Sequence, residues 1–583
     1  PENTGSSGSY YWYYGADEEK DKSHQSEEKS TYFFNHNSGE MIRVDYRKFH
    51  KYAHYANPDT LWKSLINQFD SDSTLIRSHI SMSDSGSINS CSVIFTDTNS
   101  SRAIHVMMIQ KHGAWYRLSA VTDTLNGPSQ FVNTFFETFR PLDDTLVGWL
   151  IFADKGEMYL NDLVAEDSTI RAQARESFHI ISFLDHHAPL LMERIANPNY
   201  DEMTFAFRRN MILDLGRRKH PDIPAFLEKH YTSVGDTVTF QMAILRSLAR
   251  QKTAEASKSI LKCIKYDLPL TSSDSDIGII FKAFGDSLQA AKALFPEIFT
   301  YTRYREYEDN IYELLATLLD SNLVTTMDYK SEYQAIYRNA RDYWKRQLAR
   351  EEEAQDKKSE YYTGYKGYTT HGGTFNPNLM VYIKLLLPYY TTEPGVRKIV
   401  DNVMKTSTSN LKVRLVGAMV TANVKVPDSI LSALSKDPYT MSDFYRQLAS
   451  IDKLNHFDTT ALNQNTFSQS ILIREGSLTG RDSLVYLDRQ FVETVKGNGY
   501  VYFFKKKKEK EKSWNLVWVG IQPEDTTKVI YKDYIRDSYG SRIYDNDNIE
   551  ELIEKEMKSI RLQGRKRAER INFDKDNYFY LFF

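Results

Sequence analysis

The spacing of apolar side chains first predicts a small α+β domain over residues 31–145. Pro58 suits the first position of a helix that Asn57 caps, and apolar residues then recur every three or four positions to form one stripe. Later apolar runs predict strands at 74–81, 87–96, 103–110 and 115–122, and a second amphipathic helix begins near Pro128. Two helices packed against an antiparallel sheet would bury all of these faces.

The last two predicted strands flank Lys111–Ala114, a connection short enough for a hairpin. Gly113 lies inside this connection and can supply a positive φ. Glycine reaches that backbone region without steric cost, so we expect the two strands to pair through this turn.

From residue 167 to residue 455 the apolar period becomes helical and stays helical. Helix pairs begin near Asp167, Glu202, Thr237 and Ser275. The resulting spacing of 35 to 38 residues lies in the range of helical solenoid repeats. We therefore expect an α-solenoid-like array, interrupted at 354–378 by an insertion rich in Tyr, Gly and Thr.

Residues 470–583 return to a mixture of strands and helices, with strand-like runs at 499–504 and 514–520 and a final amphipathic helix from Ile549 to Ile560. Residues 1–30 show neither period and are expected to be a flexible tether, and 146–166 a linker. The predicted fold is thus multi-domain α+β: a small N-terminal α+β domain, a central α-solenoid-like helical-repeat array and a C-terminal α+β domain.

Two aromatic segments are candidate partner contacts, because tyrosine and tryptophan offer large amphipathic surfaces at low entropic cost. The residues are Tyr11, Trp12 and Tyr13 near the start of the chain, and Tyr361, Tyr362, Tyr365 and Tyr368 in the insertion. The alternative is that the insertion is a plain flexible loop.

Composition narrows the class of protein. The 583 residues are 41% hydrophobic and 26% charged, which are globular values, and the length suggests several domains. Lys and Arg total 74 against 77 Asp and Glu, so the net charge of -3 argues against a whole-protein grip on nucleic acid. The longest apolar stretch, Leu146–Ala153, is too short to span a bilayer. Since the first residue is Pro1, we expect a processed or partial product, with any targeting segment upstream.

The two cysteines, Cys91 and Cys263, do not make a disulfide framework. Cys91 is in phase with Val93 and Phe95 on a strand pattern, and Cys263 lies beside Ile264 on a helical pattern. We interpret both as small buried apolar residues, although the sequence leaves open whether they pair.

Catalytic and metal-binding motifs are missing from the sequence. It contains no G-x-S-x-G elbow, no H-E-x-x-H pair and no phosphate-binding glycine loop. His186 and His187 follow Asp185, but adjacent helical positions point about 100° apart and are not expected to chelate together. The calcium-like run Asp545–Asn548 has Glu550 where an EF-hand requires glycine, so it is interpreted as a helix cap. We expect no catalytic residue, cofactor or metal, and no enzyme.

Two basic runs remain. Lys505–Lys508 is followed by Glu509 and Glu511, which is typical of a solvated hairpin tip. The second run consists of Arg561, Arg565, Lys566, Arg567 and Arg570 at the end of the last helix. Together they could contact lipid phosphate or an acidic partner, which gives peripheral membrane contact as an option without a transmembrane span.

Parts of the sequence resemble known families. Gly113–Leu118 followed by Phe131–Leu142 resembles the closing hairpin and helix of small PsbP-like α+β domains. Gly499–Pro523 resembles the C-terminal region of large Gram-negative envelope proteins that carry a TraB/GumN-type domain, and the helical array is similar in style to HEAT-like repeats. The TraB/GumN-type domain itself is absent, so no catalytic residue is carried over. The resemblance implies a bacterial cell envelope setting, in the periplasm or associated with the outer membrane.

These observations favour a non-catalytic scaffold or accessory subunit of an envelope complex, which binds other envelope proteins through its helical surface and Tyr-rich segments. One alternative is the non-catalytic portion of a larger envelope enzyme whose catalytic domain lies upstream. Another is a glycan- or peptide-binding module that uses the aromatic insertion.

Overall fold

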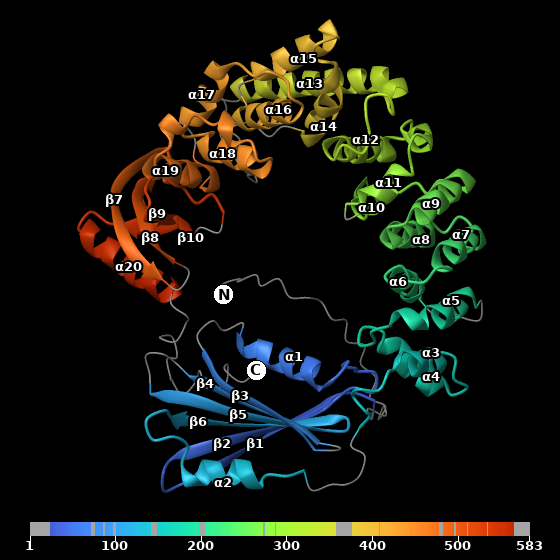
Figure 1. The fold of residues 1–583 in the computed structure, drawn as a ribbon, viewed down its shortest axis with the longest axis vertical. Helices are drawn as coiled ribbons and strands as arrows, with labels where there is room; N and C mark the ends of the chain where they lie inside the picture. Colours follow the sequence, from blue (N-terminus) through green and yellow to red (C-terminus); the bar gives the residue numbers. More distant parts are fainter. Residues whose placement is uncertain are drawn as a thin grey trace, which may run out of the picture. The chain divides into compact units, whose positions relative to one another are not determined.

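A computed structural model describes residues 24–70, 76–85, 88–96, 101–141, 148–197, 204–271, 274–285, 287–356, 376–406, 408–476, 478, 482–494, 497–509, 511–532 and 535–564. The fold is mixed α and β, with an antiparallel sheet near the N-terminus, a helical middle and a second sheet near the C-terminus (Figure 1). The expected mixed class is therefore confirmed. The chain forms two compact units, residues 1–183 and 184–583.

The first unit is built on a six-stranded antiparallel sheet with strand order β1-β2-β6-β5-β4-β3. The strands are β1 Glu27–Asn35, β2 Glu40–Lys48, β3 Ile76–Ser85, β4 Ile88–Thr96, β5 Arg102–Lys111 and β6 Ala114–Asp123. Helix α1, Pro58–Asp70, and helix α2, Gln130–Thr138, lie on opposite faces of this sheet (Figure 1). Four predicted strands and both predicted helices are confirmed, whereas β1 and β2 were not predicted.

Local sequence explains both helices. The Asn57 side chain accepts a hydrogen bond from the backbone N–H of Thr60 (2.9 Å), and Ser129 accepts one from Val132 (3.3 Å), as N-caps do. The apolar face of α2 buries Val132 against Ile42 and Ala120 of the sheet.

The β5–β6 hairpin forms as expected, but its backbone differs from the prediction. The positive φ belongs to His112 (55°) and not to Gly113. Gly113 is instead required by close packing, since a Cβ atom there would lie 2.4 Å from the backbone oxygen of Trp149.

The first unit also extends into intervals that were expected to lack structure. Strand β1 begins at Glu27, inside the expected tether of residues 1–30. The expected linker, 146–166, contains α3, Gly156–Asp162, whose Tyr159 and Leu160 are fully buried. These buried side chains make α3 part of a core instead of a connection. Helix α4, Ser168–Glu176, follows in the same unit.

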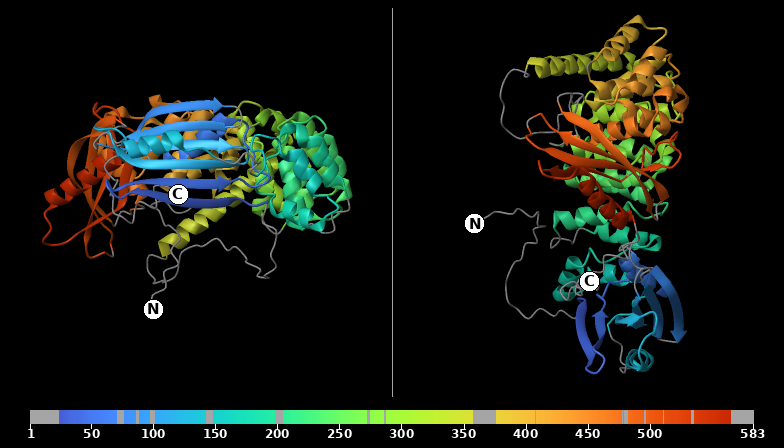
Figure 2. Two further views of the ribbon diagram at one scale, coloured as in Figure 1. Left: turned by 90° about the horizontal axis from the view of Figure 1, so that it is seen from below. Right: turned by 90° about the vertical axis from the view of Figure 1, so that its left-hand side faces the viewer.

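The second unit begins with a long row of helices. In chain order they are η1 Asp185–His187, α5 Ala188–Ala196, α6 Phe205–Leu215, α7 Ile223–Ser233, α8 Val238–Gln251, α9 Ala254–Tyr266, α10 Asp274–Lys282, α11 Leu288–Lys292, η2 Glu297–Tyr301, α12 Arg305–Asp320, η3 Lys330–Glu332, α13 Tyr333–Asp356, α14 Pro377–Leu386, η4 Leu387–Tyr389, α15 Pro394–Met404, α16 Ser409–Thr421, α17 Asp428–Lys436, α18 Met441–Ser450, η5 Leu454–His456, η6 Thr459–Ala461 and α19 Gln464–Glu475. The long helix α13 (yellow-green) projects past its neighbours (Figure 2).

These helices pack in two layers. Helices α6, α8, α10, α12, α14, α16 and α18 contact one another in succession and form one layer, and α5, α7, α9 and α11 form the start of the other. The helices from α5 to α9 therefore pack against the next helix but one, and α7, α8 and α9 also pack against their neighbours in sequence. Close packing between α6 and α8 depends on Gly216, because a Cβ atom there would lie 2.5 Å from Cα of Ser247.

The C-terminal sheet has strand order β10-β9-β8-β7 and is antiparallel throughout. Its strands are β7 Ser483–Thr494, β8 Gly497–Lys507, β9 Trp514–Pro523 and β10 Ile535–Ile543. Helix α20, Ile549–Gly564, packs Ile553, Met557 and Ile560 on one face, against Val501 and Phe503 of β8.

The other face of this sheet meets α19, which contacts β7, β8 and β9. Tyr502 alternates with Val501 and Phe503 along β8, so its side chain points away from α20. Its hydroxyl donates a 2.9 Å hydrogen bond to the side chain of Gln464 in α19. The Gln464 Nε2 atom in turn donates to the backbone oxygens of Pro523, Asp525 and Lys528 at 2.8 to 3.1 Å.

None of the described helices combines the length and the apolar content that crossing a bilayer requires.

Candidate functional site

The seven aromatic residues predicted as partner contacts lie outside the described residues. Tyr11, Trp12 and Tyr13 belong to residues 1–23, and Tyr361, Tyr362, Tyr365 and Tyr368 belong to residues 357–375. Their contribution to a binding surface therefore stays a prediction.

The helices on both sides of the insertion are joined by a polar cluster around Asp309 of α12. Tyr343 of α13 and Asn378 of α14 each donate a 2.6 Å hydrogen bond to its Oδ2, and Tyr382 of α14 donates one of 2.6 Å to Oδ1. Burial, followed by the Asp309 carboxylate that accepts its hydrogen bond, raises the pKa of Tyr343 to about 12. Three donors satisfy this carboxylate, so the cluster holds α12, α13 and α14 together.

The strongest candidate for a binding site is a groove formed by helices α6, α8 and α10 of one layer. Its volume is about 560 Å³, which falls in the range of ligand-binding clefts. Its lining consists of Arg209, Leu213, Val238, Thr239, Met242, Ala243, Arg246, Leu270, Thr271, Ile279 and Ile280. Most of these side chains are apolar, and Leu270 is 52% exposed beside Ile279, which is 36% exposed. The groove thus presents accessible apolar surface between helices.

Arginines supply the charge of this groove. Arg209 on α6 is exposed and Arg246 on α8 is half-buried. Among the described residues, no carboxylate forms an ion pair with either guanidinium, and the only hydrogen bond of Arg209 is a 3.4 Å contact with the neighbouring Asn210. Burial and the nearby charges of Arg246 and Arg217 lower the pKa of Arg250, one helical turn further along α8.

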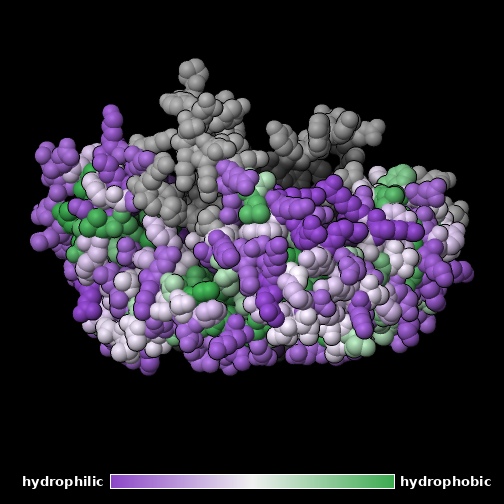
Figure 3. Space-filling view, turned by 90° about the horizontal axis from the view of Figure 1, so that it is seen from above, coloured by the Kyte–Doolittle hydropathy of each residue, from purple (hydrophilic) through white to green (hydrophobic). Residues whose placement is uncertain are grey.

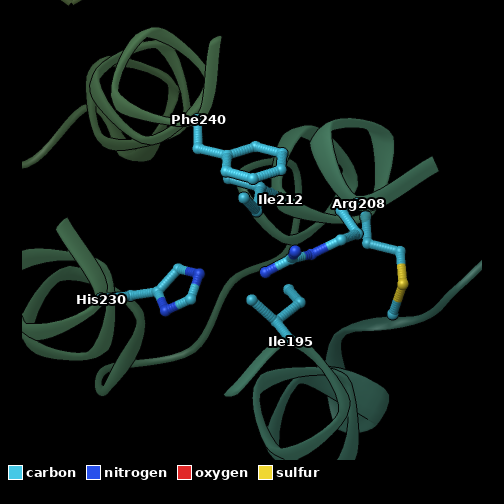
Figure 4. A pocket seen from close by; sticks show the side chains of 6 residues that line it. Ile195, Arg208, Ile212, His230 and Phe240 are labelled. Atoms are coloured by element: carbon cyan, nitrogen blue, oxygen red, sulfur yellow. The ribbon is translucent and has the colours of Figure 1, made fainter. Parts of the chain in front are cut away.

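A second, smaller cavity is lined by side chains of α5, α6, α7 and α8. It has a volume of about 10 Å³, close to the space that one water needs. Figure 4 shows the Arg208 guanidinium between the ring of Phe240 and the side chains of Ile195 and His230, with its carbon 4.8 Å from the ring centroid of Phe240. Burial and the charge of Arg208 lower the pKa of His230 to about 4. The site is filled by its own side chains and leaves no room for an organic ligand.

The first unit contains a serine beside a histidine, but their hydrogen bonds do not activate the serine. The Nε2 atom of His50 lies 3.2 Å from the hydroxyl of Ser177, and the backbone N–H of Tyr52 donates to Nδ1 (3.1 Å). The Ser177 hydroxyl donates to the backbone oxygen of Gln173 (2.6 Å), so Nε2 must be the donor to Ser177. A general base would have to accept that hydroxyl proton. Burial and the neighbouring His24 lower the pKa of His50 to about 4, which keeps it neutral.

The histidines of η1 differ from the expectation. The rings of His186 and His187 do not diverge, and their centroids are 4.0 Å apart. Nδ1 of His187 accepts a hydrogen bond from the backbone N–H of Leu184 (2.9 Å).

The calcium-like run caps a helix, as the sequence indicated. The Asn548 side chain accepts a hydrogen bond from the backbone N–H of Glu550 (3.0 Å), at the start of α20. The Asp547 carboxylate accepts one from the backbone N–H of Tyr544 (2.7 Å). Both side chains therefore serve the turn into the helix.

The prediction of a solvated tip at Lys505–Lys508 is wrong for most of the run. Strand β8 continues to Lys507, and Lys506 is only 6% exposed. Lys505 and Lys507 point to the other side, with their Nζ atoms 4.9 and 5.9 Å from the ring centroid of Trp514. Of the second basic run, Arg565, Lys566, Arg567 and Arg570 lie outside the described residues.

Cys91 and Cys263 are both buried and are not joined by a disulfide, as expected for small apolar residues. Burial, followed by the charge of Glu228, raises the pKa of Cys263 to about 12. A thiol in this environment is a weak nucleophile at neutral pH.

Comparison of the chain with protein-family models, with curated protein sequences and with solved structures gives no match.

Proposed function

We propose that this protein is a non-catalytic scaffold or accessory subunit, which binds partner proteins through the surface of an α-solenoid-like array of helix pairs. The observation that carries the proposal is the groove of α6, α8 and α10, where accessible apolar side chains lie beside arginines that no described carboxylate neutralises. Arginine and methionine, both of which line this groove, are enriched in protein–protein interfaces relative to the rest of the protein surface.

Hydrogen bonds between successive helix pairs support the solenoid interpretation. The Ser247 hydroxyl donates to the backbone oxygen of Ile212 (2.8 Å) and the Gln251 amide to that of Gly216 (2.8 Å), both 35 residues back in the sequence. Tyr231 donates to the backbone oxygen of Asp267 (2.7 Å), 36 residues ahead. Similar contacts at nearly constant separation are what stacked repeats produce, because each repeat contacts its neighbours in the same way.

The face drawn in Figure 3 has no large flat apolar patch among its coloured residues. The face drawn in Figure 3 is largely hydrophilic, and its hydrophobic residues form small separate areas among the coloured residues. Large permanent interfaces are marked by contiguous apolar surface, which this face does not present among the described side chains.

The cellular setting is part of the proposal. We place the assembly in the bacterial cell envelope, in the periplasm or at the outer membrane, with other envelope proteins as partners. The support is the resemblance of Gly499–Pro523 to envelope proteins of the TraB/GumN-associated kind. Fractionation of the source cells would test this part separately, since recovery of the protein only in the cytosolic fraction would contradict it.

Site-specific crosslinking tests the binding surface. A photoreactive amino acid replaces Thr239, which is exposed in the groove, and in the control it replaces Lys258, which is exposed on α9 of the other layer. After irradiation of the source cells, we expect defined protein adducts at position 239 and not at position 258. Absence of adducts at 239, or the same adducts at both positions, would contradict the proposal.

A further inference from the structure

We propose that the groove of α6, α8 and α10 binds an extended, acidic peptide segment of the partner protein, with apolar side chains on the groove floor and carboxylates on Arg209 and Arg246. This inference rests on the proposed function and specifies the chemistry of the partner. Leu213, Met242 and Ile279 are apolar lining residues, one from each of the three helices, and we refer to them together as the floor.

The charge of the groove selects the sign of the ligand. Arg209 and Arg246 project from successive helices of the same layer, and no described carboxylate pairs with them. The nearest acidic side chain on α6, Asp214, is engaged by Arg217 (3.4 Å) and Arg218 (3.7 Å) at the end of that helix. Two guanidinium groups that no described carboxylate pairs with, beside apolar side chains, favour an anion, and a planar carboxylate can accept two hydrogen bonds from each.

The apolar floor selects the kind of anion. A bare phosphate or a nucleic acid backbone gains nothing from Leu213, Met242 and Ile279. A lipid surface would need an exposed amphipathic face, whereas these apolar side chains lie in a groove of about 560 Å³ between helices. A peptide with alternating acidic and apolar residues satisfies both the guanidinium groups and the floor, because alternate side chains of an extended chain point in opposite directions.

The partial burial of Arg246 affects how much an ion pair with it contributes to binding. An exposed ion pair contributes little, because water and salt screen it. Arg246 is half-buried in the lining of the groove, so a carboxylate bound to it would be less exposed to solvent than one bound to Arg209. We therefore expect Arg246 to contribute more to binding than the exposed Arg209.

Fluorescence polarisation of a labelled peptide tests the inference directly. The probe is a ten-residue peptide of alternating Glu and Leu, and the comparison probe has Lys in place of Glu. We expect the full chain to bind the Glu–Leu peptide at least ten times more tightly than the Lys–Leu peptide, and to bind it more weakly at high salt. Equal binding of the two peptides would overturn the inference. Displacement of the labelled Glu–Leu peptide by inorganic phosphate at a concentration equal to that of the peptide would also overturn it.

Charge reversal locates the site. The double variant R209E/R246E should lose binding of the Glu–Leu peptide by at least tenfold, whereas the control R341E/R350E, which makes the same charge change on exposed positions of α13, should keep it. If R209E/R246E does not fold, as judged by its far-UV circular dichroism and thermal midpoint, the milder R209Q/R246Q replaces it. Unchanged peptide binding in the folded groove variant would contradict the inference.

The two proposals fail in different ways. If Thr239 crosslinks to a partner but charge reversal leaves that adduct unchanged, the acidic-peptide inference is wrong and the scaffold proposal stands. If the groove variant loses both the peptide and the adduct, both are supported. If no adduct forms in the source cells, the proposed function fails even where the isolated protein binds the peptide.

Discussion

The Tyr382 hydroxyl of α14 donates a 2.6 Å hydrogen bond to Oδ1 of Asp309 in α12, across 73 residues of sequence. This bond and those from Tyr343 and Asn378 converge on one carboxylate, so the helices before and after the insertion are fixed to each other whatever the insertion does. A partner that contacts the insertion would thus bind next to helices whose relative positions these hydrogen bonds fix.

Replacement of Asp309 by Ala should destabilise the second unit by about 3 kcal/mol, because it leaves the buried Tyr382 hydroxyl and its neighbours without an acceptor. Urea unfolding followed by circular dichroism measures the effect. The control is Asp320→Ala, at the end of the same helix, which removes an exposed ion pair with Lys384 and should cost less than about 1 kcal/mol. Equal losses of unfolding free energy in the two variants would show that the Asp309 cluster contributes no more to stability than the exposed ion pair does.

The pH dependence of stability should reflect His230. Its folded pKa, about 4, lies below the ordinary value of 6.5, so the unfolded chain binds more protons between these two values. The contribution of neutral His230 to the free energy of unfolding is therefore complete above pH 6.5, and it is lost as the pH drops toward 4. His230→Gln removes this titration, and we expect its thermal midpoint to fall less than that of the native protein between pH 7 and pH 5. Parallel curves for the two proteins would contradict the assignment.

Gly216 should not tolerate a methyl group. Gly216→Ala would place Cβ 2.5 Å from the Ser247 backbone, and the two helices would have to separate at a cost of about 2 kcal/mol. Gly278→Ala is the matched control, because the nearest atom there is the end of the Asn310 side chain at 3.2 Å and alanine favours the helix. Thermal unfolding should thus separate the two variants, with the control at or above the native midpoint.

Cys263 should resist thiol reagents while the protein is folded. The thiol is 2% exposed and its pKa is raised to about 12, so little thiolate is available at pH 8. Labelling with a chromogenic disulfide should be negligible in the native state and complete in guanidinium chloride. In the variant Cys91→Ser, which leaves one thiol, rapid native labelling would show that the helix pair around Cys263 opens readily.

Sequence patterns predicted the elements whose stabilising contacts are local. Helix α1 was predicted from Asn57, Pro58 and a periodic apolar stripe, and all of these features act within one helix. Strand β2 escaped prediction because its middle carries Arg43 and Asp45, which read as surface residues. In the structure both are buried, and Asp45 pairs with Arg43 (2.7 Å) and with Arg117 (2.7 Å), 72 residues away. No local pattern could show that pairing.

The groove could not be predicted for a similar reason. Arg209 and Arg246 are separated by 36 intervening residues, and each alone looks like an ordinary charge on an amphipathic helix. They come together because alternate helices share a layer, and that packing depends on contacts such as the one between Gly216 and Ser247. A search for arginines at equivalent positions of successive repeats is the signal that could have revealed them.

The Gln464 side chain has a final consequence for how the protein behaves at high concentration. A stack of helix pairs exposes an apolar end to which another stack can attach, and natural arrays must close that end to remain dispersed. By binding Tyr502 and three backbone oxygens, Gln464 fastens the C-terminal sheet over the last helix of the row. The sheet thus covers the side of α19 on which a further helix pair of the row would otherwise stack.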